Sequence, residues 1–240
     1  MTAALLKPSA GETDRELQAR ALSARFLGAS PDEVIRFSIE EGFAGRIALV
    51  SSFGAEAAVL LHMVSTIEPN LPVVFLETGK HFAQTLSYRR KLAAQLGLNH
   101  VIDVHPDKDE AKAEDPGEDL WRRDADACCD LRKVRPLENA LAPFEAWFTG
   151  RKAFHGGERM RLPIFEWNGT HMKVNPLVAF TPEDIAAYRQ RHELPAHPLV
   201  AQGFPSIGCW PCTKPVGAGD DVRAGRWRGQ SKAECGIHGR

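Results

Sequence analysis

All five cysteines of this 240-residue chain lie in two segments, and their spacing suggests chemistry. Four of them form two close pairs, and the fifth stands alone three residues before a histidine. The pairs are Cys128 with Cys129 and Cys209 with Cys212, and the lone thiol is Cys235. Close pairs that are distant in sequence are typical of metal sites, whereas a leftover thiol is free to react.

The adjacent cysteines bear on which metal the chain could bind. The sulfurs around one tetrahedral Zn²⁺ ion must lie within roughly 4 Å of each other. Adjacent residues of a helix or strand point in different directions, so they chelate a single ion poorly. A [4Fe–4S] cluster presents a separate iron to each thiolate. The spacing therefore favours such a cluster, and zinc, two disulfides or inert buried thiols remain as alternatives. The expected ligands are Cys128, Cys129, Cys209 and Cys212.

Composition indicates one sizeable globular domain. Hydrophobic residues make up 43% of the chain, and the formal net charge of -1 gives no basic excess that would point to nucleic acid. No apolar run reaches membrane length, and the first six residues are too few for the apolar region of a signal peptide. We therefore expect a cytoplasmic protein that binds neither membrane nor nucleic acid, and in which thiols stay reduced.

Alternating strand and helix patterns predict an α/β fold with a mostly parallel sheet flanked by helices. Short apolar runs at 46–51, 73–76 and 100–104 predict buried strands, and the segments between them predict helices. Such a βαβαβ series implies parallel strands with right-handed crossovers. Further strands are expected at 146–150 and 173–177. Further helices are expected at 12–28, from 30 to about 41, from the vicinal cysteines to Leu141, and from 181 to about 192.

Two turns follow predicted strands and should lie at the same edge of the sheet. The turn at 51–56 leads into a helix whose first N–H groups could bind a phosphate, although it also fits an ordinary connection. The second turn spans residues 77–81. Ligands of parallel sheets bind at the carboxyl ends of strands. The candidate substrate contacts are Ser52, Gly54, Thr78 and Gly79.

Two basic segments add candidate anion-binding groups. The first is a loop with Arg151, Lys152, Arg159 and Arg161, which fits either a solvated loop or one that holds an anionic substrate. The second begins at Val216 and carries six glycines, little apolar material, and the bases Arg223, Arg226, Arg228 and Lys232. Such a composition predicts mobility. We therefore expect one domain over residues 1–215 and a mobile tail over 216–240 that carries Cys235.

Taken in order, these motifs resemble the phosphoadenylyl/adenylyl-sulfate reductase family, and specifically its iron–sulfur branch, which reduces adenosine 5′-phosphosulfate (APS). The paired cysteines and the Glu-Cys-Gly-x-His tail are the most specific features. The matching segments are 51–56, 77–82, 128–133, 147–150, 173–177, 205–213, 223–227 and 234–238. The resemblance implies a fold like that of the adenine nucleotide α-hydrolases. The basic loop departs from the family's usual sequence, which leaves open whether Arg151, Lys152 or Arg159 contacts substrate.

The resemblance also implies a reaction, in which APS and reduced thioredoxin give sulfite, AMP and oxidised thioredoxin. Cys235 would be the nucleophile and would form an S-sulfocysteine intermediate. Arg159, Arg223, Arg226 and His238 would bind substrate, with the tail bases and His238 supplying positive charge. Lys133 would link the substrate electrostatically to a cluster that carries no electrons. A homo-oligomer is possible.

Three rival functions remain at this point. A reductase of 3′-phosphoadenylyl sulfate (PAPS) usually lacks the four paired cysteines. An ATP pyrophosphatase of the same fold would need a different first turn. A Cys₄ zinc module that binds a partner would leave the lone thiol of Cys235 without a purpose.

Overall fold

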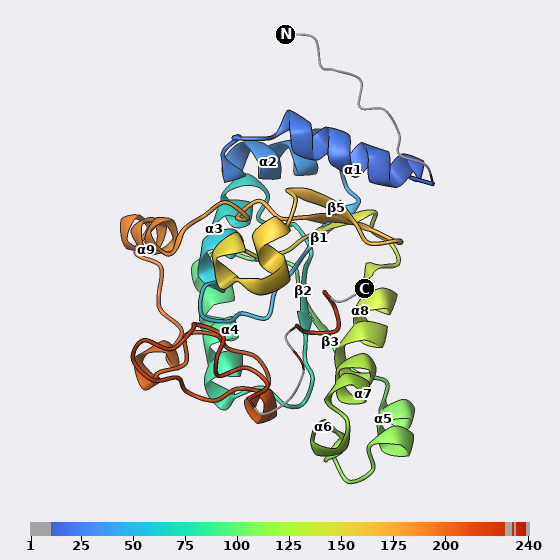
Figure 1. Ribbon diagram of the computed structural model, residues 1–240, viewed down its shortest axis with the longest axis vertical. Coiled ribbons are helices and arrows are strands. Elements are labelled where there is room, and N and C mark those ends of the chain that lie inside the picture. The colour runs from blue at the N-terminus through green and yellow to red at the C-terminus, as the bar shows by residue number, and fades with distance from the viewer. Residues whose placement is uncertain (1–10, 229–231, 233, 239–240) are drawn as a thin grey trace.

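The computed structural model describes residues 11–228, 232 and 234–238, and part of the expected tail lies outside these ranges. Its centre is a six-stranded sheet in the order β3-β2-β1-β4-β6-β5 (Figure 1). The strands are β1 (Ile47–Val50), β2 (Val73–Leu76), β3 (Val101–Val104), β4 (Ala146–Phe148), β5 (Phe165–Trp167) and β6 (Met172–Val174). All neighbours are parallel except β5 and β6. The mostly parallel α/β sheet is confirmed, whereas β5 was not expected.

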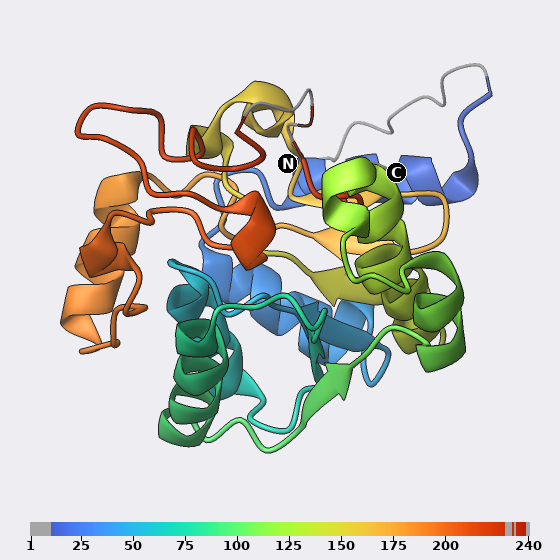
Figure 2. The ribbon, with the colours of Figure 1, turned by 90° about the horizontal axis from the view of Figure 1, so that it is seen from below.

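Both faces of the sheet are buried, as parallel sheets require. Ile47 and Leu49 of β1 join a large core on one face, and Ala48 joins a smaller core on the other. The first face is covered by α1 (Asp14–Arg25), α2 (Pro31–Phe37), α3 (Ala57–Ile67), α4 (Ala83–Gln95) and α9 (Pro182–Arg191). The second is covered by α8 (Arg135–Leu141), on the opposite side of the strands from α3 and α4 (Figures 1 and 2).

The helix that carries the vicinal cysteines is interrupted by a π-helical turn. It consists of α7 (Ala125–Cys129), the π turn η2 (Asp130–Val134) and α8. Pro136 has no N–H to donate to the preceding turn, which accounts for the break in the α-helical hydrogen bonds. The predicted helix from the cysteines to Leu141 is thus confirmed. Lys133 lies in its π turn. Such turns are frequent at functional sites.

The remaining elements are short. They are η1 (Ser38–Gly42), α5 (Lys108–Glu114), α6 (Leu120–Arg123), η3 (Ala153–His155), η4 (Gly157–Arg161), η5 (Val200–Gln202) and η6 (Trp210–Cys212). The described part of the tail packs against the domain, because Trp227 is buried and Thr213 forms a β-bridge with Arg226. The mobility of this tail and the domain boundary at residue 215 stay predictions. Within the described ranges, every helix is too short or too polar to cross a membrane.

Candidate active site

A cavity of about 210 Å³ lies at the carboxyl ends of β1, β2 and β4, where the sequence places the ligand-binding turns. Its walls come from both basic segments as well as from the first turn. In Figures 1 and 2 the last described residues, in red, lie between the yellow η3–η4 segment and the green helices α7 and α8. Eight of the predicted site residues line it, and they are Ser52, Gly54, Lys133, Arg159, Arg223, Arg226, Cys235 and His238.

The second turn contributes differently from the first. Thr78 is completely buried, and its hydroxyl lies 3.4 Å from the sulfur of Cys209. Gly79 has a positive φ of 69°, which favours glycine, and Arg132 donates a hydrogen bond of 3.0 Å to the carbonyl of Thr78. Neither Thr78 nor Gly79 is among the residues that line the cavity. This turn therefore supports the cysteine region, and a substrate contact from it stays a prediction.

The four paired thiols are reduced and gather in one region. Cys128, Cys129 and Cys209 are buried and Cys212 is partly buried. Burial raises the pKa of Cys128 to about 11, and the charges of Cys209 and Cys212 contribute while Arg132 opposes them. These thiols are thus close enough to interact electrostatically. Over the described residues, no three His, Cys, Asp or Glu side chains converge so as to hold a single metal ion.

Lys133 links this thiol region to the cavity. Its ammonium nitrogen lies 3.6 Å from the sulfur of Cys235, and no described carboxylate pairs with it. Burial alone would lower the pKa of Lys133, but negative charge on Cys209, Cys235 and Cys129 raises it. A cation withdrawn from water needs a nearby negative charge. A cluster held by four thiolates would supply that charge, so the surroundings of Lys133 fit the group that the cysteine spacing predicts.

The lone thiol of Cys235 is set up to ionise. Its pKa lies well below the usual value because the Cys129 thiol donates a hydrogen bond to it and because Lys133 and Arg226 are nearby, although burial opposes this. If Cys129 binds a metal, its thiol proton is lost. The two cations would then be the groups that stabilise the Cys235 thiolate, and a thiolate is the nucleophilic form of cysteine.

Most cations of the basic loop are already paired with carboxylates. Arg151 contacts Glu166 on β5. The ammonium of Lys152 lies 2.8 Å from Glu56, which also accepts from His155 at 3.1 Å. Burial disfavours the charged form of Glu56, yet His155 and Lys152 lower its pKa to about 2.

The third loop cation, Arg159, is held by the tail. It binds Glu234 through two hydrogen bonds, at 2.5 and 2.8 Å. Arg151, Lys152 and Arg159, the three loop cations considered as substrate contacts, therefore all line the cavity with a carboxylate partner.

Arg226 is the exception among the arginines of the cavity. Among the described residues, its Nη1 reaches only the hydroxyl of Ser206, at 3.5 Å, and its buried Nε has no partner. Its guanidinium packs on the ring of Trp227, 4.4 Å from the centroid. A Cβ on Gly208 would lie 2.4 Å from Nη2, so a glycine is needed for the side chain to pass. Arg226 has no carboxylate partner among the described residues, so it is available to bind an anionic ligand as well as to stabilise the Cys235 thiolate.

His238 enters the cavity as a neutral ring. It stacks on Trp147 at a centroid distance of 6.0 Å, and its buried Nδ1 has no partner in the part of the chain that the structure describes. Burial, followed by the charges of Arg151 and Arg159, lowers its pKa well below the usual value. The expectation that His238 supplies positive charge was therefore wrong. A neutral imidazole can still exchange a hydrogen bond with a ligand.

Sequence reasoning assigned no role to Glu56, Trp147 or Glu234, all of which line the cavity. Glu56 lies in the turn after the first predicted strand and Trp147 lies within the strand predicted at 146–150, so their positions could have identified them. Glu234 directly precedes the lone thiol of Cys235 within a basic tail. A single acidic residue among basic ones, next to the candidate nucleophile, could have identified it as a site residue.

Comparison with known proteins gives one consistent family. Residues 46–215 match the model of the phosphoadenosine phosphosulfate reductase domain. A protein from Mesorhizobium japonicum named adenosine 5′-phosphosulfate reductase is 49% identical over 230 residues, which cover 95% of this chain and 91% of the relative. A protein of the same name from Chelativorans sp. is 47% identical over 226 residues, covering 94% and 92%.

A solved structure shares the fold as well. The phosphoadenylyl-sulfate (PAPS) reductase of Candida auris, crystallised with phosphate, superposes with a TM-score of 0.68 at 27% identity, covering 82% of this chain and 96% of that one. The match to the family model covers most of the chain. This chain belongs to the phosphoadenosine phosphosulfate reductase family.

Proposed function

We propose that this chain is an APS reductase that releases sulfite and AMP through a covalent intermediate on Cys235. The observation that carries the proposal is the 3.6 Å contact between Cys235 and Lys133 at the wall of a cationic cavity. Lys133 and Arg226 have no carboxylate partner among the described residues. These two cations match the two negative charges of the phosphosulfate group of APS. The names of the bacterial relatives agree with this assignment.

The first step would be attack of the Cys235 thiolate on the sulfur of the sulfate. An S–S bond forms, the bond from sulfur to the bridging oxygen breaks, and AMP leaves with the electron pair. Lys133 and Arg226 would stabilise the thiolate before attack and the phosphosulfate charge during it. His238 would hydrogen-bond to the substrate through Nδ1, which has no partner among the described residues.

The second step would use thioredoxin or a similar dithiol. One of its thiolates attacks the sulfur of Cys235, the S–S bond to the sulfite group breaks, and sulfite leaves with the electron pair. The second thiol then resolves the mixed disulfide, which regenerates the Cys235 thiol and yields oxidised thioredoxin. Because Cys235 is partly buried against Cys129 and Lys133, the tail must move outward before a protein thiol can reach it.

Cys128, Cys129, Cys209 and Cys212 would hold a [4Fe–4S] cluster. When bound, the cluster would supply a fixed negative charge next to Lys133 and no redox chemistry, since the dithiol provides both electrons. The hydroxyl of Thr78 would hydrogen-bond to a ligand sulfur. The adjacency of Cys128 and Cys129 in sequence favours a cluster over a single zinc ion, because a cluster presents a separate iron to each thiolate. We further propose a cytoplasmic location, where a dithiol donor stays reduced. A homo-oligomer is compatible with this function.

The second candidate substrate is PAPS, because the Candida auris neighbour carries that name. PAPS has an additional 3′-phosphate, which would need further cations. Arg151, Lys152 and Arg159 are each occupied by a carboxylate, so the charge balance favours APS.

The test is to measure sulfite release from APS and from PAPS, each with reduced thioredoxin. We expect turnover with APS and little with PAPS. Turnover with neither nucleotide, in protein that retains its iron, would contradict the proposed function.

A further inference from the structure

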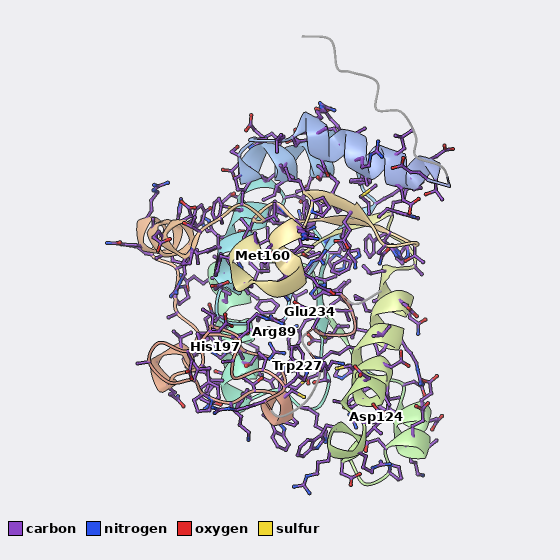
Figure 3. All side chains as sticks on the ribbon, in the orientation of Figure 1. Arg89, Asp124, Met160, His197, Trp227 and Glu234 are labelled. Atoms are coloured by element: carbon purple, nitrogen blue, oxygen red, sulfur yellow. The ribbon has the colours of Figure 1, made fainter. Side chains whose placement is uncertain are left out.

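The contacts of Glu234 stand out among those of the tail. Both carboxylate oxygens bind Arg159, and Oε2 also lies 3.4 Å from Nη2 of Arg223. The side chain is only 20% exposed. Figure 3 shows Glu234 below Met160 of η4 and above Trp227, at the centre of the molecule. A two-point contact between a carboxylate and a guanidinium fixes orientation as well as distance.

A second ion pair holds the tail, also from a residue that precedes the nucleophile. The ammonium of Lys232 pairs with Asp126 of α7, two residues before Cys128. Cys235 therefore follows two ion pairs, one to the cysteine helix and one to the basic loop. The described tail has little apolar surface to fix its position, apart from Trp227 and the partly buried Ile237. Ion pairs must then do much of the positioning.

We propose that Glu234 is a positioning residue, whose ion pair with Arg159 holds the sulfur of Cys235 against Lys133 at the cavity. The inference rests on the proposed function for its catalytic consequence, although the anchoring itself does not. Consecutive Cα atoms are about 3.8 Å apart, so a fixed carboxylate at residue 234 strictly limits where the next thiol can go. On this account Arg159 positions the tail and is not a ligand of the sulfate.

One alternative predicts the opposite effect on binding. If Glu234 only filled an anion site until substrate displaced it, removing its charge would free Arg159 and Arg223 and tighten APS binding. If Glu234 is an anchor, removing the charge should leave binding nearly unchanged and slow the chemical step. The APS affinity and the rate of the chemical step in a Glu234 variant therefore distinguish the two roles.

The experiment compares wild type, Glu234→Gln, Glu234→Asp and the control Glu158→Gln, all as anaerobically purified holoprotein. Glu158 is exposed and adjacent to Arg159, so the control makes the same charge change beside the same arginine.

The first readout is the rate at which iodoacetamide labels Cys235, followed by the mass of the tryptic peptide of residues 233–240. We expect labelling to be faster by about ten-fold or more in Glu234→Gln, since losing one hydrogen bond to a charged group costs about a factor of ten at the lower end of its usual range. The control should match wild type. Equal labelling rates in Glu234→Gln and wild type would refute the proposal that Glu234 anchors the tail.

The second readout is the single-turnover rate at which APS modifies Cys235 without thioredoxin. We expect a loss of about 10²-fold in Glu234→Gln, the usual effect of a misplaced reacting group, with partial recovery in Glu234→Asp. APS affinity, measured in a Cys235→Ser background, should change by less than about three-fold. Arg159→Gln should slow modification similarly, and combining it with Glu234→Gln should add little. Tighter APS binding or an unchanged rate in Glu234→Gln would overturn the proposal. If wild type forms no adduct, the proposed function fails and the labelling rates still decide whether Glu234 anchors the tail.

Discussion

Replacing Arg226 with alanine should weaken APS binding more than any other single change among the tail arginines. The side chain lines the cavity, has no carboxylate partner among the described residues, and keeps a buried Nε without a partner. Hydrogen bonds to charged groups contribute about 1.5–3 kcal/mol. The dissociation constant of APS should therefore rise by about 10- to 150-fold. Arg223→Ala should have a smaller effect, because Glu234 already takes part of the hydrogen-bonding capacity of Arg223.

The assay is calorimetric titration in a Cys235→Ser background, so that no covalent step disturbs the equilibrium. APS and AMP are titrated separately, because a residue that contacts the sulfate should matter less for AMP. Arg228→Ala is the matched control, since Arg228 is an exposed arginine two residues further along the tail. If Arg226→Ala binds APS as tightly as Arg228→Ala does, the assignment of Arg226 as the open anion site is refuted.

Three further predictions concern the paired cysteines, Gly208 and His197. Changing Cys128, Cys129, Cys209 or Cys212 to Ser should remove iron and visible colour together, because a cluster with an unsatisfied iron is unstable; a native protein with about one zinc and no acid-labile sulfide would contradict this. Gly208→Ala should retain iron yet weaken APS binding by about 1 kcal/mol or more, because its Cβ would displace the guanidinium of Arg226; unchanged titration would show that Arg226 is not needed in that position. Burial lowers the pKa of His197 from 6.5 to about 4, so the unfolded chain binds a proton in this range that the folded one does not. The free energy of unfolding should then fall by about 2 kcal/mol between pH 7.5 and 5, and His197→Asn should lose that part of the slope in denaturant titrations at the two pH values.

The sheet could be predicted because its strands are short apolar runs separated by helical patterns. The capped helix starts at Ser30 and Thr181 were equally clear, and both form capping boxes in the structure. The strand that the sequence did not predict, β5 (Phe165–Trp167), is three residues long and contains a charged Glu166. Nothing in so short a segment distinguishes a strand from a loop, and its pairing with β6 depends on the tertiary fold.

Many of the residues that line the cavity could be predicted from the sequence, but the ion pairs among them could not. The first turn, the cysteine and basic segments and the family resemblance together identified eight residues that line the cavity. Which cations remain available for substrate depends on carboxylates from distant segments, namely Glu56, Glu166 and Glu234. His238 illustrates the same limit, because its loss of charge comes from burial among arginines that the local sequence does not reveal.

The central claim is that Cys235 accepts the sulfite group from APS. The most direct measurement is intact and peptide mass spectrometry of holoprotein incubated with APS in the absence of any thiol donor. We predict one added sulfite group, located on Cys235, which disappears when reduced thioredoxin is added. Cys235→Ser should bind APS and keep its iron but gain no mass, because an alcohol is a far poorer nucleophile than a thiolate. The added mass on another residue, or sulfite production by Cys235→Ser at a rate near that of wild type, would contradict the mechanism.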